Sequence, residues 1–402
     1  MKILIVSQHY YPEPFKITDI AEKLVLRGHS VTVLCGIPNY PEGYYYKNYS
    51  LKENRVQTIN GVKIIRAFEH PRKKGIVNRV LNYYSFSFFA KKLVKDLDDD
   101  FDVILANELS PIMMVEPAVK YKKKHKVKIL MYEMDLWPES LLAGGIKKDC
   151  FVYNYYKKVS SKIYGQMDKI LVSSLPHIDY IGKLTGNMNN IEWLPQYADD
   201  PIESFVRSFS SKKTSFLFAG NIGKAQNVKL ILDAASLLKD DTDIEFTIVG
   251  SGSELDNLKQ YKEKLKLNNV SFVGRVPLNE MGAFLKSADA GIVSLTHDSY
   301  SSMTIPGKVQ TYMKAGLPII ACSGEATNSF VKTAKCGLVC NDFTPTSLAK
   351  IFKIYHNLDI QEKKKLSDNC LSYYESNLTM EKFINVLEEN LILLSKGANS
   401  CD

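Results

Sequence analysis

Short, continuous apolar runs alternate with polar loops and with segments whose apolar residues recur at helical spacing. The first apolar run covers residues 1–7 and is followed by a polar loop and by a predicted helix from residue 17 to residue 24. Gly28 ends this helix, and residues 31–35 form the next apolar run. Continuous apolar runs are typical of parallel strands covered on both faces. This strand–loop–helix–strand unit therefore predicts a doubly wound α/β domain.

The same pattern continues, with a second series beginning after a polar, irregular stretch at residues 199–213. In the first series we expect further strands at 62–68, 101–106, 127–131, 169–173 and 191–195, and helices at 71–95, 112–122 and 150–166. In the second we expect strands at 215–219, 245–249, 270–273, 291–295 and 317–322, and helices at 228–238, 279–286, 306–314 and 380–396. The predicted fold is α/β, with two tandem Rossmann-like domains at 1–198 and 199–378 facing a central cleft.

The composition is that of a soluble globular protein, with 45% hydrophobic and 24% charged residues among 402. No apolar run approaches the length of a membrane span, and the first apolar run is too short for a signal peptide. The seven cysteines form no CxxC motif, which indicates reduced thiols in a cytosolic protein. Metal binding by Cys336 and Cys340 is an alternative, although no cluster has zinc spacing.

The positive charge is concentrated in the first half of the chain. Residues 1–195 contain 29 Lys/Arg and 20 Asp/Glu (+9), and the remainder contains 23 and 24 (−1). Residues 71–95 hold seven Lys/Arg, no acid, and aromatic residues between 83 and 89, which predicts contact with an anionic membrane surface. The alternative is a helix packed on the sheet with a solvated basic face. Because no recognition motif accompanies the charge, nucleic acid is not expected as a partner.

Candidate phosphate chemistry lies in the second series. Lys308 falls in the first turn of the helix expected at 306–314, beside free N–H groups, and Gln310 could reach a hydroxyl. Glycine turns at 220–223 and 250–252 follow two strands, a pattern that suits a diphosphate held without metal. The alternative is an ordinary βαβ unit with a solvated lysine. Leu255 replaces the third glycine of G-x-G-x-x-G, which disfavours a nicotinamide cofactor.

Six motifs resemble the retaining family-4 glycosyltransferases of the GT-B fold. They are Arg27-Gly28-His29, Asp135-Leu136-Trp137-Pro138-Glu139-Ser140, Gly220-Asn221-Ile222-Gly223, Val249-Gly250-Ser251-Gly252, Phe272-Val273-Gly274-Arg275 and the segment from Pro306 to Pro318. The second and third are most similar to a bacterial O-antigen and capsule subgroup that includes N-acetyl-L-fucosaminyltransferases. The resemblance implies a nucleotide sugar in the C-terminal domain, an acceptor in the N-terminal domain, and a last segment, 379–402, that crosses back to the N-terminal domain.

The resemblance also implies roles for particular residues. Asp135 and Lys308 would be catalytic, although a helix N-cap is an alternative for Asp135. The donor would contact Gly220, Asn221, Gly223, Lys224, Gly250, Arg275, Val276, Gly307, Lys308 and Gln310, and the acceptor would contact Glu13, Lys16, Asp135 and Glu139. The sequence departs from the family in having Ser302 and Gln310 for two glutamates, Asn221 for an arginine, Pro14-Phe15 for two glycines and Met134 for a histidine.

The implied activity is retaining, metal-independent transfer of a sugar from a UDP-sugar to a polyprenyl-diphosphate-linked glycan in capsule or O-antigen synthesis. The sugar would be an N-acetylated deoxyhexose such as N-acetylfucosamine. The enzyme would lie in the cytoplasm, peripherally attached to the inner face of the bacterial plasma membrane. A catalytically degenerate nucleotide-sugar-binding protein and a GT-B sugar-nucleotide epimerase are the alternatives.

Overall fold

The computed structural model describes residues 1–97, 100–198, 202–209 and 212–398. The chain forms two compact units, and each is described by itself. The first comprises Met1–Leu194 together with Phe383–Asp402, and the second comprises Pro195–Lys382. The first segment thus ends at Leu194, four residues before the expected boundary at 198/199, and residues 199–201 lie outside the described part of the chain.

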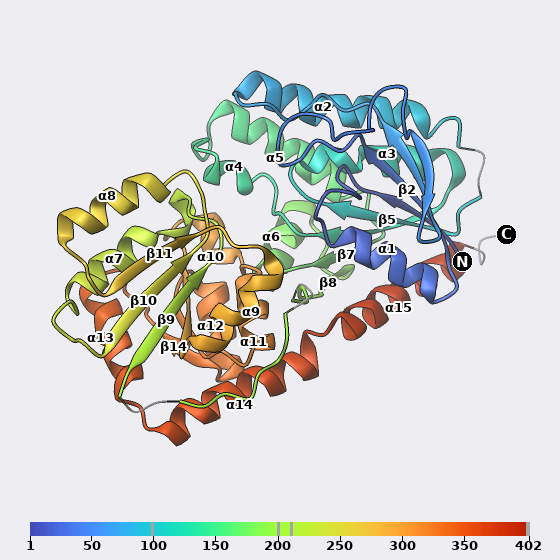
Figure 1. Ribbon diagram of the computed structural model, residues 1–402. Helices are drawn as coiled ribbons and strands as arrows, with labels where there is room; N and C mark the ends of the chain where they lie inside the picture. Colours follow the sequence, from blue (N-terminus) through green and yellow to red (C-terminus); the bar gives the residue numbers. More distant parts are fainter. Residues whose placement is uncertain (98–99, 199–201, 210–211, 399–402) are drawn as a thin grey trace. The chain divides into compact units, whose positions relative to one another are not determined.

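The first unit is built on an eight-stranded sheet of order β3-β4-β2-β1-β5-β6-β7-β8, parallel except for β3. Helices α2, α3 and α5 cover one face, and α1 and α15 lie on the other (Figure 1). Its elements are β1 Lys2–Val6, α1 Ile17–Leu26, β2 Ser30–Gly36, β3 Val56–Ile59, β4 Val62–Ala67, α2 Ile76–Leu93, β5 Val103–Glu108, η1 Ile112–Val115, α3 Glu116–His125, β6 Lys128–Glu133, α4 Ser140–Ala143, α5 Phe151–Tyr164, β7 Lys169–Val172, α6 Pro176–Thr185, β8 Ile191–Trp193 and the C-terminal α15 Met380–Ala398.

The second unit contains a six-stranded parallel sheet of order β11-β10-β9-β12-β13-β14. Helices α7, α8 and α13 lie on one face, and α9 and α11 on the other (Figure 1). Its elements are β9 Thr214–Ala219, η2 Lys224–Gln226, α7 Val228–Ser236, β10 Ile244–Val249, α8 Leu255–Leu265, β11 Val270–Gly274, η3 Leu278–Glu280, α9 Met281–Ser287, β12 Ala290–Ser294, α10 Ser299–Met303, α11 Lys308–Lys314, β13 Ile319–Cys322, α12 Glu325–Ala334, β14 Gly337–Val339, α13 Pro345–Asn357 and α14 Ile360–Asn377.

The central strands are continuous apolar runs because helices bury both faces of each sheet. All six residues of β5 and all five of β12 are buried. In each sheet the strand order reverses at one point, between β1 and β5 in the first unit and between β9 and β12 in the second. Ligands of doubly wound folds bind beyond the carboxyl ends of the strands at such a switch point. The α/β prediction of two Rossmann-like units is confirmed.

Several local predictions were wrong for identifiable reasons. Strand β3, which the sequence analysis did not predict, is a half-exposed edge strand paired antiparallel to β4. The polar stretch 296–304, between the expected strand at 291–295 and the expected helix at 306–314, contains the short helix α10. The Asp298 side chain caps this helix by accepting a hydrogen bond from the Ser301 N–H (2.8 Å). Helix α11 begins at Lys308, two residues later than expected.

The C-terminal helix α15 packs on the first unit through residues distant in sequence. Glu388 accepts hydrogen bonds from Arg27 Nη1 and from His29 Nε2, both at 2.6 Å. The Phe383 ring lies 5.1 Å from the Tyr132 ring at the end of β6. Three apolar side chains of the helix, Ile384, Leu387 and Leu391, are fully buried. The helix thus completes the core of a unit whose other residues all precede residue 195.

Candidate active site

Two glycine turns meet at the carboxyl end of the second sheet. Gly220 follows β9 with φ +135°, and Gly250 follows β10 with φ +144°. A Cβ atom on Gly250 would lie 1.8 Å from the Gly220 carbonyl oxygen, and one on Gly252 would lie 2.4 Å from that of Ile222. No side chain fits such distances, so these glycines are required by the close approach of the two backbones.

The same packing occupies most of the N–H groups expected to bind phosphate. Three of them, at Gly220, Ile222 and Gly223, donate to the Val249 carbonyl (3.0 Å), the Ser251 carbonyl (2.8 Å) and Gln226 Oε1 (3.1 Å), respectively. In the described residues the Asn221 N–H is the one member of this turn without such a partner. The turn therefore offers a ligand fewer backbone donors than the glycine pattern predicts.

Lys308 lies directly against this turn. Its Nζ is buried and has no hydrogen-bond partner among the described residues. The Nζ lies 3.5 Å from the centre of the Phe218 ring, and a Cβ on Gly220 would lie 3.4 Å from it. Burial away from water lowers the pKa of Lys308 to about 7. An anion bound at the switch point would give this amine a hydrogen-bond partner, and its negative charge would favour protonation of the amine.

Gln310 differs from the expectation that its side chain faces a ligand. The side chain is 2% exposed, and its amide nitrogen lies 3.1 Å from the Gly307 carbonyl and 3.2 Å from the Pro306 carbonyl when the amide is oriented to satisfy both of its ends. Gln310 thus binds the backbone at the start of its own helix. No hydroxyl-binding orientation of this side chain is seen.

The other donor candidates surround the strand ends. Asn221 and Lys224 are exposed beyond β9, and Arg275 and Val276 follow β11, the first exposed and the second half-buried. Gly307 is exposed, and a Cβ there would meet nothing within 4 Å. The structure thus places these residues at the carboxyl edge where Lys308 lies.

In the first unit Asp135 is half-buried just beyond the carboxyl end of β6. The alternative that it caps a helix is wrong, because α4 begins at Ser140 and its N-cap residue is Glu139. Asp135 lies among further acids. The carboxylates of Glu133 on β6 and Glu108 on β5 are fully buried and occupy paired positions in the two strands.

This buried acidic cluster was not predicted from the sequence. Glu133 Oε2 lies 2.8 Å from His177 Nδ1, whereas Glu133 Oε1, both Glu108 carboxylate oxygens and His177 Nε2 have no hydrogen-bond partner among the described residues. Burial, followed by the charges of Glu133 and Asp135, raises the pKa of Glu108 well above its usual value. Burial and the neighbouring carboxylates therefore both favour the protonated form of Glu108. The sequence feature that could have indicated this cluster is the glutamate at the end of each of the two strands β5 and β6.

The remaining acceptor candidates are largely engaged within the protein. Glu13 is 3% exposed; its Oε1 accepts from the Asn39 and Tyr40 N–H groups (both 2.6 Å), and its Oε2 lies 2.8 Å from His9 Nδ1. This geometry gives Glu13 a structural role in holding the loop at residues 39–40. Glu139 is 1% exposed and accepts from the Tyr153 hydroxyl (2.5 Å), while Lys16 is half-buried at the start of α1.

Two kinds of feature are absent from the described residues. No group of three or more His, Cys, Asp or Glu side chains among them is arranged to hold a metal ion. None of the helices described is both long and apolar enough to cross a membrane.

Comparison with known proteins agrees with this geometry. Residues 199–370, which contain both glycine turns and Lys308, match the family described as Glycosyl transferases group 1. The chain is 25% identical over 332 residues to WbjE of Pseudomonas aeruginosa, described as a probable glycosyltransferase, covering 79% of this chain and 82% of that protein. It is 22% identical over 377 residues to WcaI of Escherichia coli K12, named as a glycosyl transferase of colanic acid biosynthesis, covering 85% of this chain and 86% of that protein.

Among solved structures, the Anabaena protein Alr3699/HepE in complex with UDP and glucose superposes with a TM-score of 0.68 at 14% identity, covering 97% of this chain and 99% of that chain. At this identity the likeness shows the GT-B fold alone. The family match to residues 199–370 and the two relatives show that this chain is a transferase enzyme.

Proposed function

We propose that this enzyme transfers a sugar from a UDP-sugar to a polyprenyl-diphosphate-linked glycan in capsule or O-antigen synthesis. The observation that carries the donor half of the proposal is the buried, unpartnered Lys308 Nζ beside Gly220 at the switch point of the second sheet. A diphosphate there would supply the missing partner and the negative charge that favours protonation. The UDP bound by the Anabaena structure supports the choice of nucleotide.

The proposed chemistry follows from charge development on the leaving group. As the bond between the sugar C1 and the UDP oxygen breaks, negative charge grows on the diphosphate, and protonated Lys308 stabilises it. The acceptor oxygen bonds to C1 on the face that UDP leaves, which retains the configuration. The acceptor proton passes to the departing phosphate oxygen, and Asp135 orients the acceptor hydroxyl or assists as base. No metal is required in this scheme.

The finer assignments rest on the motifs and on the relatives' names. An N-acetylated deoxyhexose such as N-acetylfucosamine is the proposed sugar because of the motifs at residues 135–140 and 220–223. The colanic acid biosynthesis named for WcaI supports a role in polysaccharide synthesis. Residues 71–95, with seven basic residues and no acid, are proposed to attach the enzyme to the inner face of the plasma membrane from the cytoplasm.

A thermal-shift titration with UDP, GDP, ADP and NAD, each with and without EDTA, tests the donor assignment. We expect UDP alone to raise the melting temperature, EDTA to have no effect, and Lys308→Ala to abolish the shift. A shift with NAD would overturn the assignment.

Turnover separates the proposal from its alternatives. If UDP binds but purified enzyme neither transfers nor hydrolyses any UDP-sugar, the protein is a degenerate nucleotide-sugar-binding protein, as Ser302 and Gln310 in place of two family glutamates would permit. If the donor sugar is epimerised without an acceptor, the enzyme is an epimerase.

A further inference from the structure

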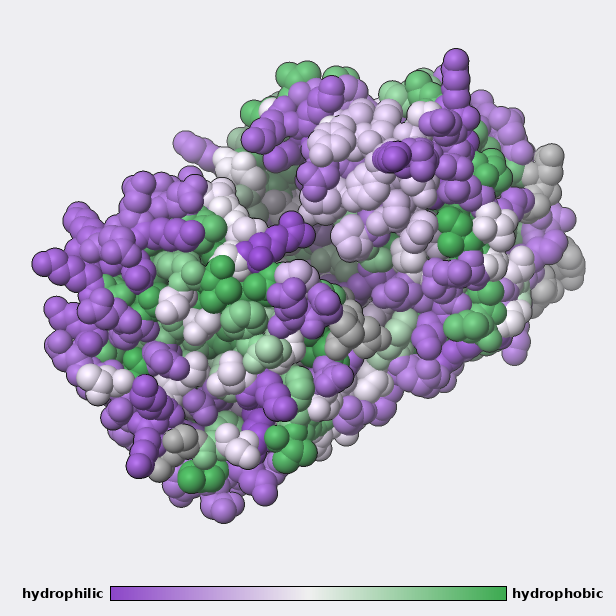
Figure 2. Space-filling model, viewed as in Figure 1, coloured by the Kyte–Doolittle hydropathy of each residue, from purple (hydrophilic) through white to green (hydrophobic). Residues whose placement is uncertain are grey.

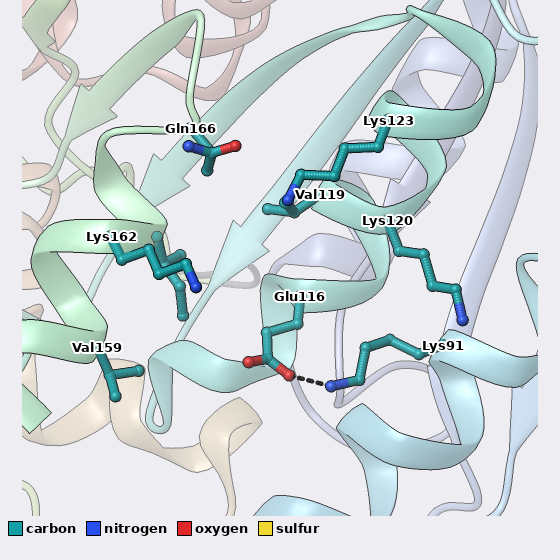
Figure 3. Close-up of a pocket in the computed structure, with 9 residues that line it drawn as sticks. Lys91, Glu116, Val119, Lys120, Lys123, Val159, Lys162 and Gln166 are labelled. Atoms are coloured by element: carbon teal, nitrogen blue, oxygen red, sulfur yellow. Dashed lines mark hydrogen bonds and ion pairs between the residues drawn. The ribbon is translucent and has the colours of Figure 1, made fainter.

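A pocket of about 390 Å³ lies between α2, α3 and α5 of the first unit (Figure 3). Its walls carry four lysines, Lys91 on α2, Lys120 and Lys123 on α3, and Lys162 on α5, and its apolar lining includes Val119. The lining contains none of the proposed donor or acceptor residues. This pocket is therefore separate from the site described above.

The charges in this pocket are not balanced. Glu116 is its single lining acid, and Lys91 and the Ser87 hydroxyl (2.5 Å) already bind one of its oxygens. Among the described residues no ion pair is formed by Lys120, Lys123 or Lys162. Partial desolvation, and then repulsion from Lys95 and Lys91, lowers the pKa of Lys120. A bound anion would relieve this repulsion.

Exposed apolar side chains lead to the pocket along α2. Val77, Leu81, Tyr84 and Phe88 recur at intervals of three or four residues, so they share one face of the helix, and Lys91 continues it. All four are exposed, with Val77 at 72% and Phe88 at 52%. The interior face of α2 is formed by other residues, including Phe86 and Ala90.

Helix α5 repeats the arrangement. Phe151 (87% exposed) and Tyr155 (49% exposed) lie on the helix face that reaches Lys162 two turns later. The Tyr84 hydroxyl is 3.0 Å from the Tyr156 hydroxyl, which joins the two helices midway. Figure 2 shows apolar residues mixed with hydrophilic ones along the edge formed by α2. Two apolar stripes thus converge on one lysine pocket, as in an amphiphile-binding surface.

We propose that the lysine pocket binds the phosphate headgroup of an anionic membrane lipid while the stripes on α2 and α5 enter the apolar part of the bilayer. This inference rests on the membrane part of the proposed function and gives it a specific site, independent of donor chemistry. A lipid is favoured over a free phosphate because the apolar stripes would otherwise remain uncovered. The positive charge of the pocket lysines also attracts them to the negatively charged surface of such a membrane.

The test compares the native chain with two triple variants in vesicle co-sedimentation. One variant, Lys120→Ala/Lys123→Ala/Lys162→Ala, removes the pocket charges; the control, Lys47→Ala/Lys63→Ala/Lys183→Ala, removes three exposed lysines outside α2, α3 and α5. Each lysine near an anionic surface contributes roughly a fivefold factor, so the pocket variant should bind phosphatidylglycerol-containing vesicles about 100-fold more weakly than the native chain. The control should bind several-fold more tightly than the pocket variant.

Further arms identify the ligand. Leu81→Ser/Phe88→Ser should weaken vesicle binding without changing the UDP thermal shift, and pure phosphatidylcholine vesicles should bind none of the proteins. The inference is overturned if the two lysine variants weaken binding equally, if Leu81→Ser/Phe88→Ser binds the vesicles as tightly as the native chain, or if the protein prefers a nucleic acid to the vesicles. If UDP still raises the melting temperature of the pocket variant, donor binding does not depend on the lysine pocket, and the two proposals can fail independently.

Discussion

UDP binding should draw a proton from solution onto Lys308. With a pKa of about 7 in the free enzyme, this amine is about half protonated at pH 7. A diphosphate within reach of Nζ restores its charge and raises its pKa towards the usual value. Linkage then requires uptake of about half a proton per UDP at pH 7, about 0.9 at pH 8 and about 0.1 at pH 6.

Isothermal titration calorimetry in buffers of different ionisation enthalpy measures this uptake directly. The difference in apparent binding heat between two buffers, divided by the difference in their ionisation enthalpies, gives the number of protons. The phosphate of UDP itself titrates near pH 6, so the decisive comparison lies between pH 7 and pH 8. Uptake should rise over this interval because the amine of the free enzyme loses its proton there.

Matched variants attribute the proton to one side chain. Lys224→Ala removes an exposed lysine beside the same turn and should leave the uptake unchanged. Lys308→Met should weaken UDP binding and abolish the uptake. Tight UDP binding by the native enzyme with no uptake at pH 8 would refute the reasoning, since it would mean that Lys308 is already charged or does not meet the diphosphate.

Three further predictions concern stability. Lys308→Met should raise the unfolding free energy by ~4 kcal/mol at pH 7, because the folded pKa of about 7 lies below the usual 10.5. Urea unfolding measures this gain, which should shrink between pH 7 and pH 10.5. A gain that stays constant over this range would contradict the prediction. Glu108→Gln should be more stable than the native protein at pH 8 and equal to it near pH 4, because a raised carboxyl pKa costs stability only above the unfolded value. Glu133→Leu should instead lose roughly 2 kcal/mol, because it leaves the buried His177 Nδ1 without its partner at 2.8 Å, and equal effects of the two substitutions would exclude this asymmetry. Gly250→Ala should prevent stable folding in thermal melts, whereas Gly307→Ala should change the melting temperature little, since only the first Cβ meets backbone.

The sequence predicted the features that depend on local pattern. Continuous apolar runs located the central strands, and glycines after β9 and β10 marked the two turns that do come together. Lys308 was found because it follows a proline–glycine pair at a helix start, although the helix begins with Lys308 itself. These signals need only neighbours within one βαβ unit.

Features that depend on pairing between distant residues were not predictable. Glu108 and Glu133 become a pair only through the register of β5 and β6. The N–H groups of the 220–223 turn were expected to face a ligand, but those of Gly220 and Ile222 donate to the carbonyls of Val249 at the end of β10 and of Ser251 in the second glycine turn. Gln310 turns its amide to backbone three residues away, which the residue type alone does not indicate. The lysine pocket assembles from three helices separated in the chain.

The placement of α15 has a consequence for the order in which the chain can fold during synthesis. The second unit is one continuous segment, whereas the first requires residues from both ends of the chain. Until residues 384–391 leave the ribosome, the surface that receives Ile384, Leu387 and Leu391 stays uncovered. The N-terminal half therefore remains incompletely folded and prone to aggregation, while the second unit can already fold. Arg27 and His29 also lack their partner until Glu388 is synthesised. Removal of α15 would therefore destabilise the N-terminal unit, although its other residues lie far before α15 in the chain, at Met1–Leu194.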